Sequence, residues 1–116
     1  GYRRAVNILK AEAKKNPAEA DAYTGVVDPA RLVAPEEQAL AAALRQAQEA
    51  LAPQLAAEDF AAAMSSLSAL RRPVDAFFDK VLVNDADPAV RLNRLRLLSQ
   101  MRDAAGRVAD FSLITG

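Results

Sequence analysis

The sequence contains no cysteine and no histidine, and aromatic residues make up only 5% of it. Without thiolates and imidazoles, thiolate catalysis, the commonest zinc ligands and imidazole acid–base chemistry are excluded. No apolar run approaches the roughly 20 residues that a membrane-spanning helix needs, and no signal peptide opens the chain. The sequence also contains no glycine-rich phosphate loop and no nucleophile beside a base. We therefore expect no membrane partner and no catalytic site in this chain.

What the sequence does contain is alanine in helical patterns. Its 116 residues are 52% hydrophobic, and alanine is by far the commonest apolar residue. Alanine is the best helix former but fills a core poorly, so we expect closely packed helices around a modest core. The length is that of one domain. Because the chain lacks an initiator methionine and enters a helical pattern at once, we expect residues 1–116 to be one domain of a longer chain.

Two helices are predicted in the first half of the chain. The first covers about residues 2–15 and ends at Asn16-Pro17, because the residue before proline avoids the helical region. The second begins at Pro35, with acidic residues in its first turn, and Pro53 ends or kinks it. Between them, residues 16–34 have no sustained periodicity, which predicts a loop or a pair of short turns.

Three further helices are predicted in the second half: about residues 59–70, a segment restarting at Arg71-Arg72-Pro73, and a long one from Asp87-Pro88 to about residue 113. No segment has the alternation typical of a strand. The fold class expected is all-α, an antiparallel bundle of about five helices. The residues expected to face its core from the first four helices are Tyr2, Val6, Leu9, Ala13; Leu40, Leu44, Ala47, Leu51; Phe60, Met64, Leu67, Leu70; and Val74, Phe77, Phe78, Val81, Leu82.

Charge is unevenly distributed along a chain whose net charge is zero. Residues 1–15 carry five bases and one acid, net +4; residues 16–70 carry two bases and eight acids, net −6; residues 71–116 carry eight bases and six acids, net +2. Such a surface could turn one face towards phosphate while the opposite face repels it. The alternative is uneven scatter over solvated helices.

One face of the first helix has the composition of a nucleic-acid contact. Arg3, Asn7, Lys10 and Lys14 follow one another at spacings of four, three and four. Lysine and arginine neutralise phosphates, and an asparagine amide can read a base edge as donor and acceptor. A solvated helix face with no partner is the alternative.

An arginine interrupts the apolar face of the fifth helix. At about 100° per residue, Arg94 falls in the middle of a face formed by Val90, Leu97, Leu98, Met101, Ala105 and Val108. A buried guanidinium is costly unless it is paired, and Asp75 and Asp79 on the fourth helix are the expected partners. The functional alternative places Arg94 at a groove mouth against a base or phosphate, with Arg91 and Arg102 at the border of the face in contact with a nucleic-acid backbone.

Aromatic side chains could stack on unpaired bases. Phe77 and Phe78 are adjacent and point about 100° apart, so we expect one in the core and one nearer an edge. A core position for both phenylalanines is the alternative. Tyr2 and Tyr23 are further stacking candidates. Paired acids such as Glu36/Glu37 and Asp85/Asp87 are interpreted as helix-start residues and not as a catalytic dyad.

The amino-acid sequence of the last third of the chain resembles that of a known family. Three stretches carry the resemblance: Pro73-Val74-Asp75-Ala76-Phe77-Phe78-Asp79-Lys80-Val81-Leu82-Val83, Arg91-Leu92-Asn93-Arg94-Leu95-Arg96-Leu97-Leu98 and Arg107-Val108-Ala109-Asp110-Phe111-Ser112-Leu113. They resemble the C-terminal end of the beta subunit of the bacterial two-subunit glycyl-tRNA synthetase. That end is an all-helical anticodon-binding module of the DALR type. The segment Arg4-Ala5-Val6-Asn7-Ile8-Leu9-Lys10 is similar to the basic helix that opens the module, which adds Arg4 to the candidates.

The resemblance implies a function and its partners. It implies recognition of the tRNA(Gly) anticodon stem-loop in the cytoplasm, where the family discriminates the cytosines common to glycine anticodons. ATP and Mg²⁺ would act only on the alpha subunit, which this domain would reach through the rest of the beta subunit, so no cofactor, metal or DNA is expected here. At Ala104-Ala105-Gly106 the family pattern implies bulkier apolar residues, so we expect the last helix to fray or kink there. The alternative function is a helical module that docks another protein through an apolar groove, without RNA binding.

Overall fold

The computed structural model describes residues 2–81 and 87–115, except for the side chains of residues 2, 20, 24 and 110–115. Within these ranges the chain forms five α-helices and two 3₁₀ helices, and no strand. The elements are α1 (Tyr2–Lys15), η1 (Pro17–Thr24), η2 (Pro29–Arg31), α2 (Pro35–Ala56), α3 (Phe60–Ser68), α4 (Arg71–Lys80) and α5 (Pro88–Thr115). The predicted all-α bundle of about five helices is confirmed, and the predicted pair of short turns in residues 16–34 is η1 and η2.

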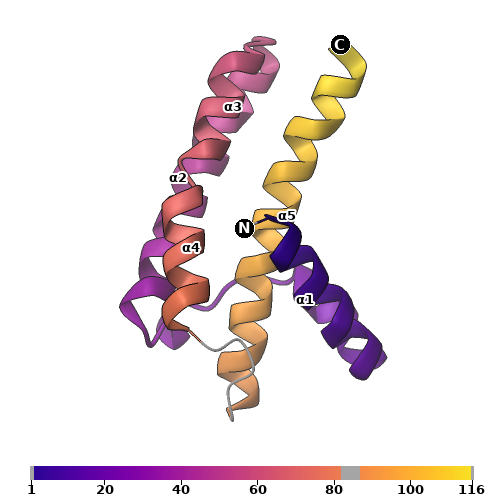
Figure 1. Cartoon of the computed structure of the whole chain (residues 1–116), viewed down its shortest axis with the longest axis vertical. Coiled ribbons are helices and arrows are strands. Elements are labelled where there is room, and N and C mark those ends of the chain that lie inside the picture. The colour runs from indigo at the N-terminus through magenta and orange to yellow at the C-terminus, as the bar shows by residue number, and fades with distance from the viewer. Residues whose placement is uncertain (1, 82–86, 116) are drawn as a thin grey trace.

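The long helix α5 is the element on which the others assemble. It contacts α1, α2, α3 and both 3₁₀ helices, while α2 also packs against α3 and α4. Figure 1 shows α3 and α4 following one another along one side of the molecule, with α2 behind them and α1 crossing α5 near its middle. In the same view, α3 and the C-terminal half of α5 diverge.

The core lies between α2, α4 and α5. All four residues predicted for the stripe of α2, Leu40, Leu44, Ala47 and Leu51, are buried. The first three belong to one cluster with Phe77 of α4 and three fully buried leucines of α5, which are Leu95, Leu97 and Leu98. Burying one such leucine or phenylalanine stabilises the fold by about 1.5–3 kcal/mol, so this cluster dominates the packing energy.

Short-range polar contacts fix the helix ends. Asp59 accepts a hydrogen bond from the N–H of Ala62 at 3.1 Å, and Asp87 accepts one from the N–H of Ala89 at 2.9 Å. Glu58 lies in the left-handed region at φ 59°, which allows the tight reversal from α2 into α3. The interpretation of Asp87 as a helix-start residue is thus confirmed, whereas Asp85 lies outside the described residues.

Three helix details differ from the sequence prediction, and a fourth prediction falls outside the described residues. Pro53 does not end α2, which continues to Ala56, because a proline removes only the one hydrogen bond that its missing N–H would have donated. Met64 was expected to face the core but is 42% exposed, since Ala63 takes the buried position in α3. In α1 the buried positions are Ala5, Leu9 and Glu12, with Val6 and Ala13 only half-buried. Leu82, predicted for the apolar face after α4, lies outside the described residues.

The fraying expected at Gly106 is not found in this structure. α5 runs without interruption through Ala104-Ala105-Gly106. Ala104 is buried in a cluster with Leu51, Ala63 and Val108, where small residues let the helices approach closely. The short side chain of Ala104 therefore serves close packing, whereas Ala105 and Gly106 are only half-buried.

Candidate nucleic-acid interface

The outward face of α1 carries the predicted basic stripe. Arg3, Asn7, Lys10 and Lys14 are all exposed, on the side of α1 away from buried Ala5, Leu9 and Glu12. No hydrogen bond or ion pair joins these four side chains to another described residue. From Arg3 to Lys14 the stripe extends about 16 Å along the helix. Its charges are therefore available to an external anion.

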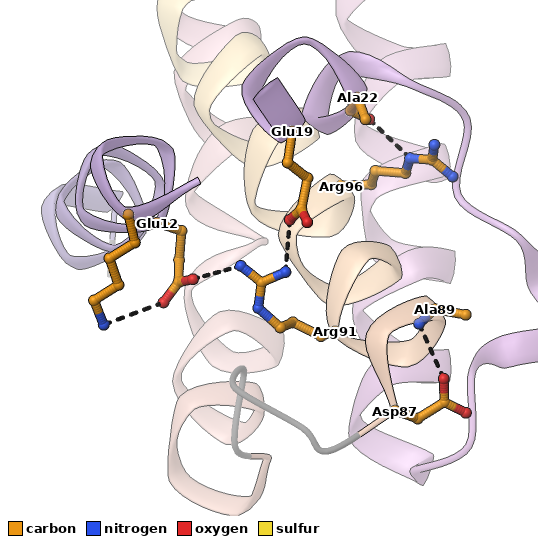
Figure 2. A network of polar contacts seen from close by, with 8 residues as sticks. Glu12, Glu19, Ala22, Asp87, Ala89, Arg91 and Arg96 are labelled. Atoms are coloured by element: carbon orange, nitrogen blue, oxygen red, sulfur yellow. Dashed lines mark hydrogen bonds and ion pairs between the residues drawn. The ribbon is translucent and has the colours of Figure 1, made fainter. Parts of the chain in front are cut away.

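Arg91, by contrast, is neutralised inside the domain. Its guanidinium donates to Glu12 of α1 and to Glu19 of η1, each at 2.6 Å, and the Arg91 and Glu12 side chains are each only 11% exposed. Figure 2 shows Arg91 between the two carboxylates, with Glu12 joined to a lysine on its other side. That lysine is Lys15, at 3.9 Å. The hydrogen bond to Glu12, followed by that to Glu19, raises the pKa of Arg91 against the opposing effect of burial. Arg91 thus fastens α1 and η1 to α5.

Two neighbouring side chains of α5 hold the segment between α1 and α2. Arg96 donates from Nε to the carbonyl of Ala22 at 2.9 Å (Figure 2) and from Nη1 to that of Val26 at 3.2 Å. Asn93 accepts from the N–H of Asp28 at 2.7 Å and donates to its carbonyl at 3.1 Å. The loop region predicted for residues 16–34 is therefore fastened to α5 by hydrogen bonds to its backbone.

Arg94 forms a buried ion pair, but not with the predicted partner. Its Nη2 lies 2.9 Å from Oε1 of Glu37 in α2, and the Glu37 side chain is fully buried. Asp75 and Asp79 are exposed on α4 and make no ion pair with it. The prediction of a structural pair was right in kind and wrong in partner, because α2 and not α4 faces Arg94. Glu37 also accepts from the N–H of Ala34 at 3.2 Å, which confirms its role at the start of α2.

The aromatic candidates divide between core and edge, as the spacing of Phe77 and Phe78 predicted. Phe77 is fully buried and Tyr23 is 3% exposed, so neither ring is available to stack on a base. Burial, followed by the charge of Glu19, raises the pKa of Tyr23. Phe78 is half-buried, and its face is covered by the guanidinium of Arg4 at 4.7 Å. The side chain of Tyr2 lies outside the described part of the molecule.

The remaining basic candidate, Arg102, makes polar contacts with α5 alone among the residues described. It donates to Ser99 at 3.2 Å and lies 3.5 Å from Asp103, with 37% of its side chain exposed. Among the residues that the structure describes, no group of three or more carboxylates could hold a metal ion. No described helix is long and apolar enough to cross a bilayer.

The sequence alone did not identify the acidic partners of Arg91 and Arg94, or the contacts of Arg96. Glu12, Glu19 and Glu37 were not assigned as ion-pair partners, and Arg96 was not singled out. One signal was present, since Glu12 stands at the spacing of Ala5 and Leu9 and interrupts the apolar face of α1. A buried carboxylate at such a position requires a cation, and the arginines crowded into residues 91–96 supply it.

Comparison with known proteins identifies a family. A family model described as the DALR anticodon binding domain matches residues 1–106. No solved structure matches the chain.

The similar curated proteins share one description. The chain is 57% identical over 118 residues to the glycine–tRNA ligase beta subunit of Phenylobacterium zucineum (strain HLK1), covering 100% of this chain and 17% of that protein. It is 58% identical over 116 residues to the same subunit of Rhodospirillum centenum (strain ATCC 51521 / SW), covering 99% and 16%. For Ruegeria sp. (strain TM1040) the identity is 47% over 116 residues, covering 100% and 16%. The chain thus spans less than a fifth of the length of these relatives.

Proposed function

The chain belongs to the DALR anticodon binding domain family, and we propose that it recognises the anticodon stem-loop of tRNA(Gly) as a module of a glycine–tRNA ligase beta subunit. In this proposal the domain does not catalyse a reaction. Glycine, ATP and Mg²⁺ are bound by the alpha subunit, which this domain reaches through the remainder of the beta subunit. The site of action is the cytoplasm, with neither a membrane nor DNA as partner.

The observation that carries the proposal is the division of basic residues between α1 and α5. Arg91 and Arg94 on α5 are neutralised by carboxylates of this chain, whereas Arg3, Lys10 and Lys14 on α1 face solvent with no ion pair to a described residue. Exposed, unneutralised cations on one helix face are the electrostatic footprint expected of a phosphate contact. The contact surface that we propose is therefore α1 and not the arginine-rich start of α5.

Asn7 gives this surface a means of reading sequence. It is exposed between Arg3 and Lys10 on the same face. Phosphate contacts position an RNA but carry no sequence information, while an amide can donate to and accept from a base edge. We assign phosphate contact to the charged residues and base contact to Asn7.

Titration of the 116-residue chain with tRNA(Gly) and a non-cognate tRNA tests the proposal. With three phosphates neutralised, the affinity for both should fall about 20- to 40-fold between about 50 and 200 mM salt. Tighter binding to tRNA(Gly) is expected at both salt concentrations, and Asn7→Ala should reduce that preference. Binding that is absent or insensitive to salt would reject the proposal and favour a helical module that docks another protein.

A further inference from the structure

A groove opens beside the basic face of α1. It has a volume of about 860 Å³ and lies between α3, the start of α4 and the C-terminal half of α5. These are the helices that diverge in Figure 1. Its lining is mainly apolar and includes Phe60, Met64 and Leu67 of α3 with Met101 and Val108 of α5. The volume falls within the range of sites that bind small organic molecules.

The charged residues of the groove show what chemistry it fits. Two arginines, Arg3 and Arg71, line it, and both are exposed. One carboxylate, Asp75, lines it too, and no hydrogen bond or ion pair joins Asp75 to another described residue. An apolar surface flanked by two cations is complementary to a planar base attached to phosphates, and a single carboxylate accepts from an exocyclic amino group.

The groove is continuous with the surface assigned to tRNA. Arg3 belongs both to the α1 stripe and to the groove lining. A strand whose phosphates follow Lys14, Lys10 and Arg3 would therefore reach the groove at the first turn of α1. Met64, 42% exposed where a core position was expected, leaves apolar surface open beside this route.

We propose that this groove receives one unpaired, amino-bearing nucleotide of the anticodon loop. The base packs against Phe60, Met64 and Leu67, its flanking phosphates contact Arg3 and Arg71, and its exocyclic amino group donates to Asp75. This inference rests on the proposed function, and it adds a base-binding site made by α3, α4 and α5 to the phosphate contacts of α1.

Matched variants of the chain test the apolar part of the site. Met64→Glu places a charge in the groove, while Ala61→Glu places the same charge on an exposed position of α3 that does not line it. Each is titrated with tRNA(Gly) carrying either an intact anticodon or an abasic nucleotide at one anticodon position in turn. Met64→Glu should weaken binding of the intact tRNA about tenfold and leave one abasic tRNA nearly unaffected, because that tRNA lacks the base. Ala61→Glu should bind both like the unmodified chain.

A second pair of comparisons tests the charged part. Arg71→Ala should weaken binding more than Arg72→Ala, since Arg72 is exposed beside it but does not line the groove. Asp75→Ala should lower the preference for cytidine over uridine at the position that the abasic series identifies, whereas Asp79→Ala, one turn further on α4, should not. Circular dichroism and urea midpoints establish that each variant is folded.

The outcomes separate this inference from the proposed function. If the unmodified chain binds tRNA(Gly) with the expected salt dependence but Met64→Glu weakens intact and abasic tRNAs equally or not at all, the groove is not a base site and the α1 proposal stands. Loss of association with the ligase subunits in Met64→Glu, with tRNA binding intact, would overturn the inference in favour of a protein contact. If the unmodified chain binds no tRNA, the proposed function itself fails.

Discussion

Arg94 of α5 donates from Nη2 to Oε1 of Glu37 in α2 across 2.9 Å, and both side chains are buried. The same carboxylate oxygen accepts from the N–H of Ala34, so one buried contact joins the first turn of α2 to α5. We expect such a pair to add little to stability compared with apolar packing, and we infer that its role is to favour one facing of the two helices.

Arg94→Met should destabilise the domain by about 3–5 kcal/mol, because it leaves the Glu37 carboxylate buried without its cation. Urea denaturation followed by circular dichroism measures the effect. The double variant Arg94→Met/Glu37→Leu should recover much of the loss, since it removes the stranded charge. A midpoint unchanged in the single variant would contradict the pairing.

Arg91→Met should destabilise by about 3 kcal/mol, because it removes the cation shared by Glu12 and Glu19. The amides of α1 should exchange with solvent faster, since Arg91 anchors α1 to α5. Arg102→Met is the matched control on the same helix. Because Arg102 makes only local contacts and is partly exposed, this variant should change the free energy of unfolding by no more than about 0.5 kcal/mol.

Replacement by alanine should change the stability of the domain in opposite directions at two glycines. A Cβ at Gly25 would lie 2.9 Å from Nε of Arg96, so Gly25→Ala should displace this guanidinium from the carbonyl of Ala22 and cost about 1 kcal/mol. Apart from the helix's own backbone, no described atom lies within 4 Å of a Cβ at Gly106 in the interior of α5, so Gly106→Ala should stabilise by about 1 kcal/mol. Thermal unfolding of both variants tests the contrast, and a stabilised Gly25→Ala would show that Arg96 is free to move aside.

The alkaline limit of stability should depend on Tyr23. Burial raises its pKa above the ordinary value of 10.0, so the unfolded chain ionises first. The contribution of Tyr23 to the free energy of unfolding is therefore complete below pH 10 and is lost as the pH rises through the pKa of the folded state. Tyr23→Phe should flatten the fall of unfolding free energy above pH 10. At pH 7 it should stabilise the domain by about 1 kcal/mol, because the buried Tyr23 hydroxyl has no hydrogen-bond partner among the described residues. An equally steep fall in the variant would assign the alkaline loss to other groups.

Local sequence signals predicted the helices well, and tertiary partners poorly. Asn16-Pro17 and Asp87-Pro88 marked helix ends correctly, because capping and proline sterics act within a few residues. The period of α2 identified its buried stripe for the same reason. Periodicity placed Arg94 on an apolar face but could not say which helix faces it, since that depends on how α2 and α4 pack.

The candidate site was predicted in the same uneven way. The exposed stripe of α1 follows from spacing alone, whereas the buried position of Tyr23 does not, because η1 has no amphipathic period to reveal its inward side. Arg91 looked like a phosphate ligand, since the sequence does not show that Glu12 and Glu19 meet it across more than 70 residues.

The most direct test of the account is the salt dependence of tRNA(Gly) binding in charge variants of α1. Lys10→Ala and Lys14→Ala should each weaken binding to tRNA(Gly) and to non-cognate tRNA alike. Each should also reduce the slope of log affinity against log salt by about 0.7 to 0.9. Arg45→Ala, an exposed base on α2, should change neither quantity. If the slopes of the two α1 variants equal that of the unmodified chain, α1 is not the face that binds tRNA.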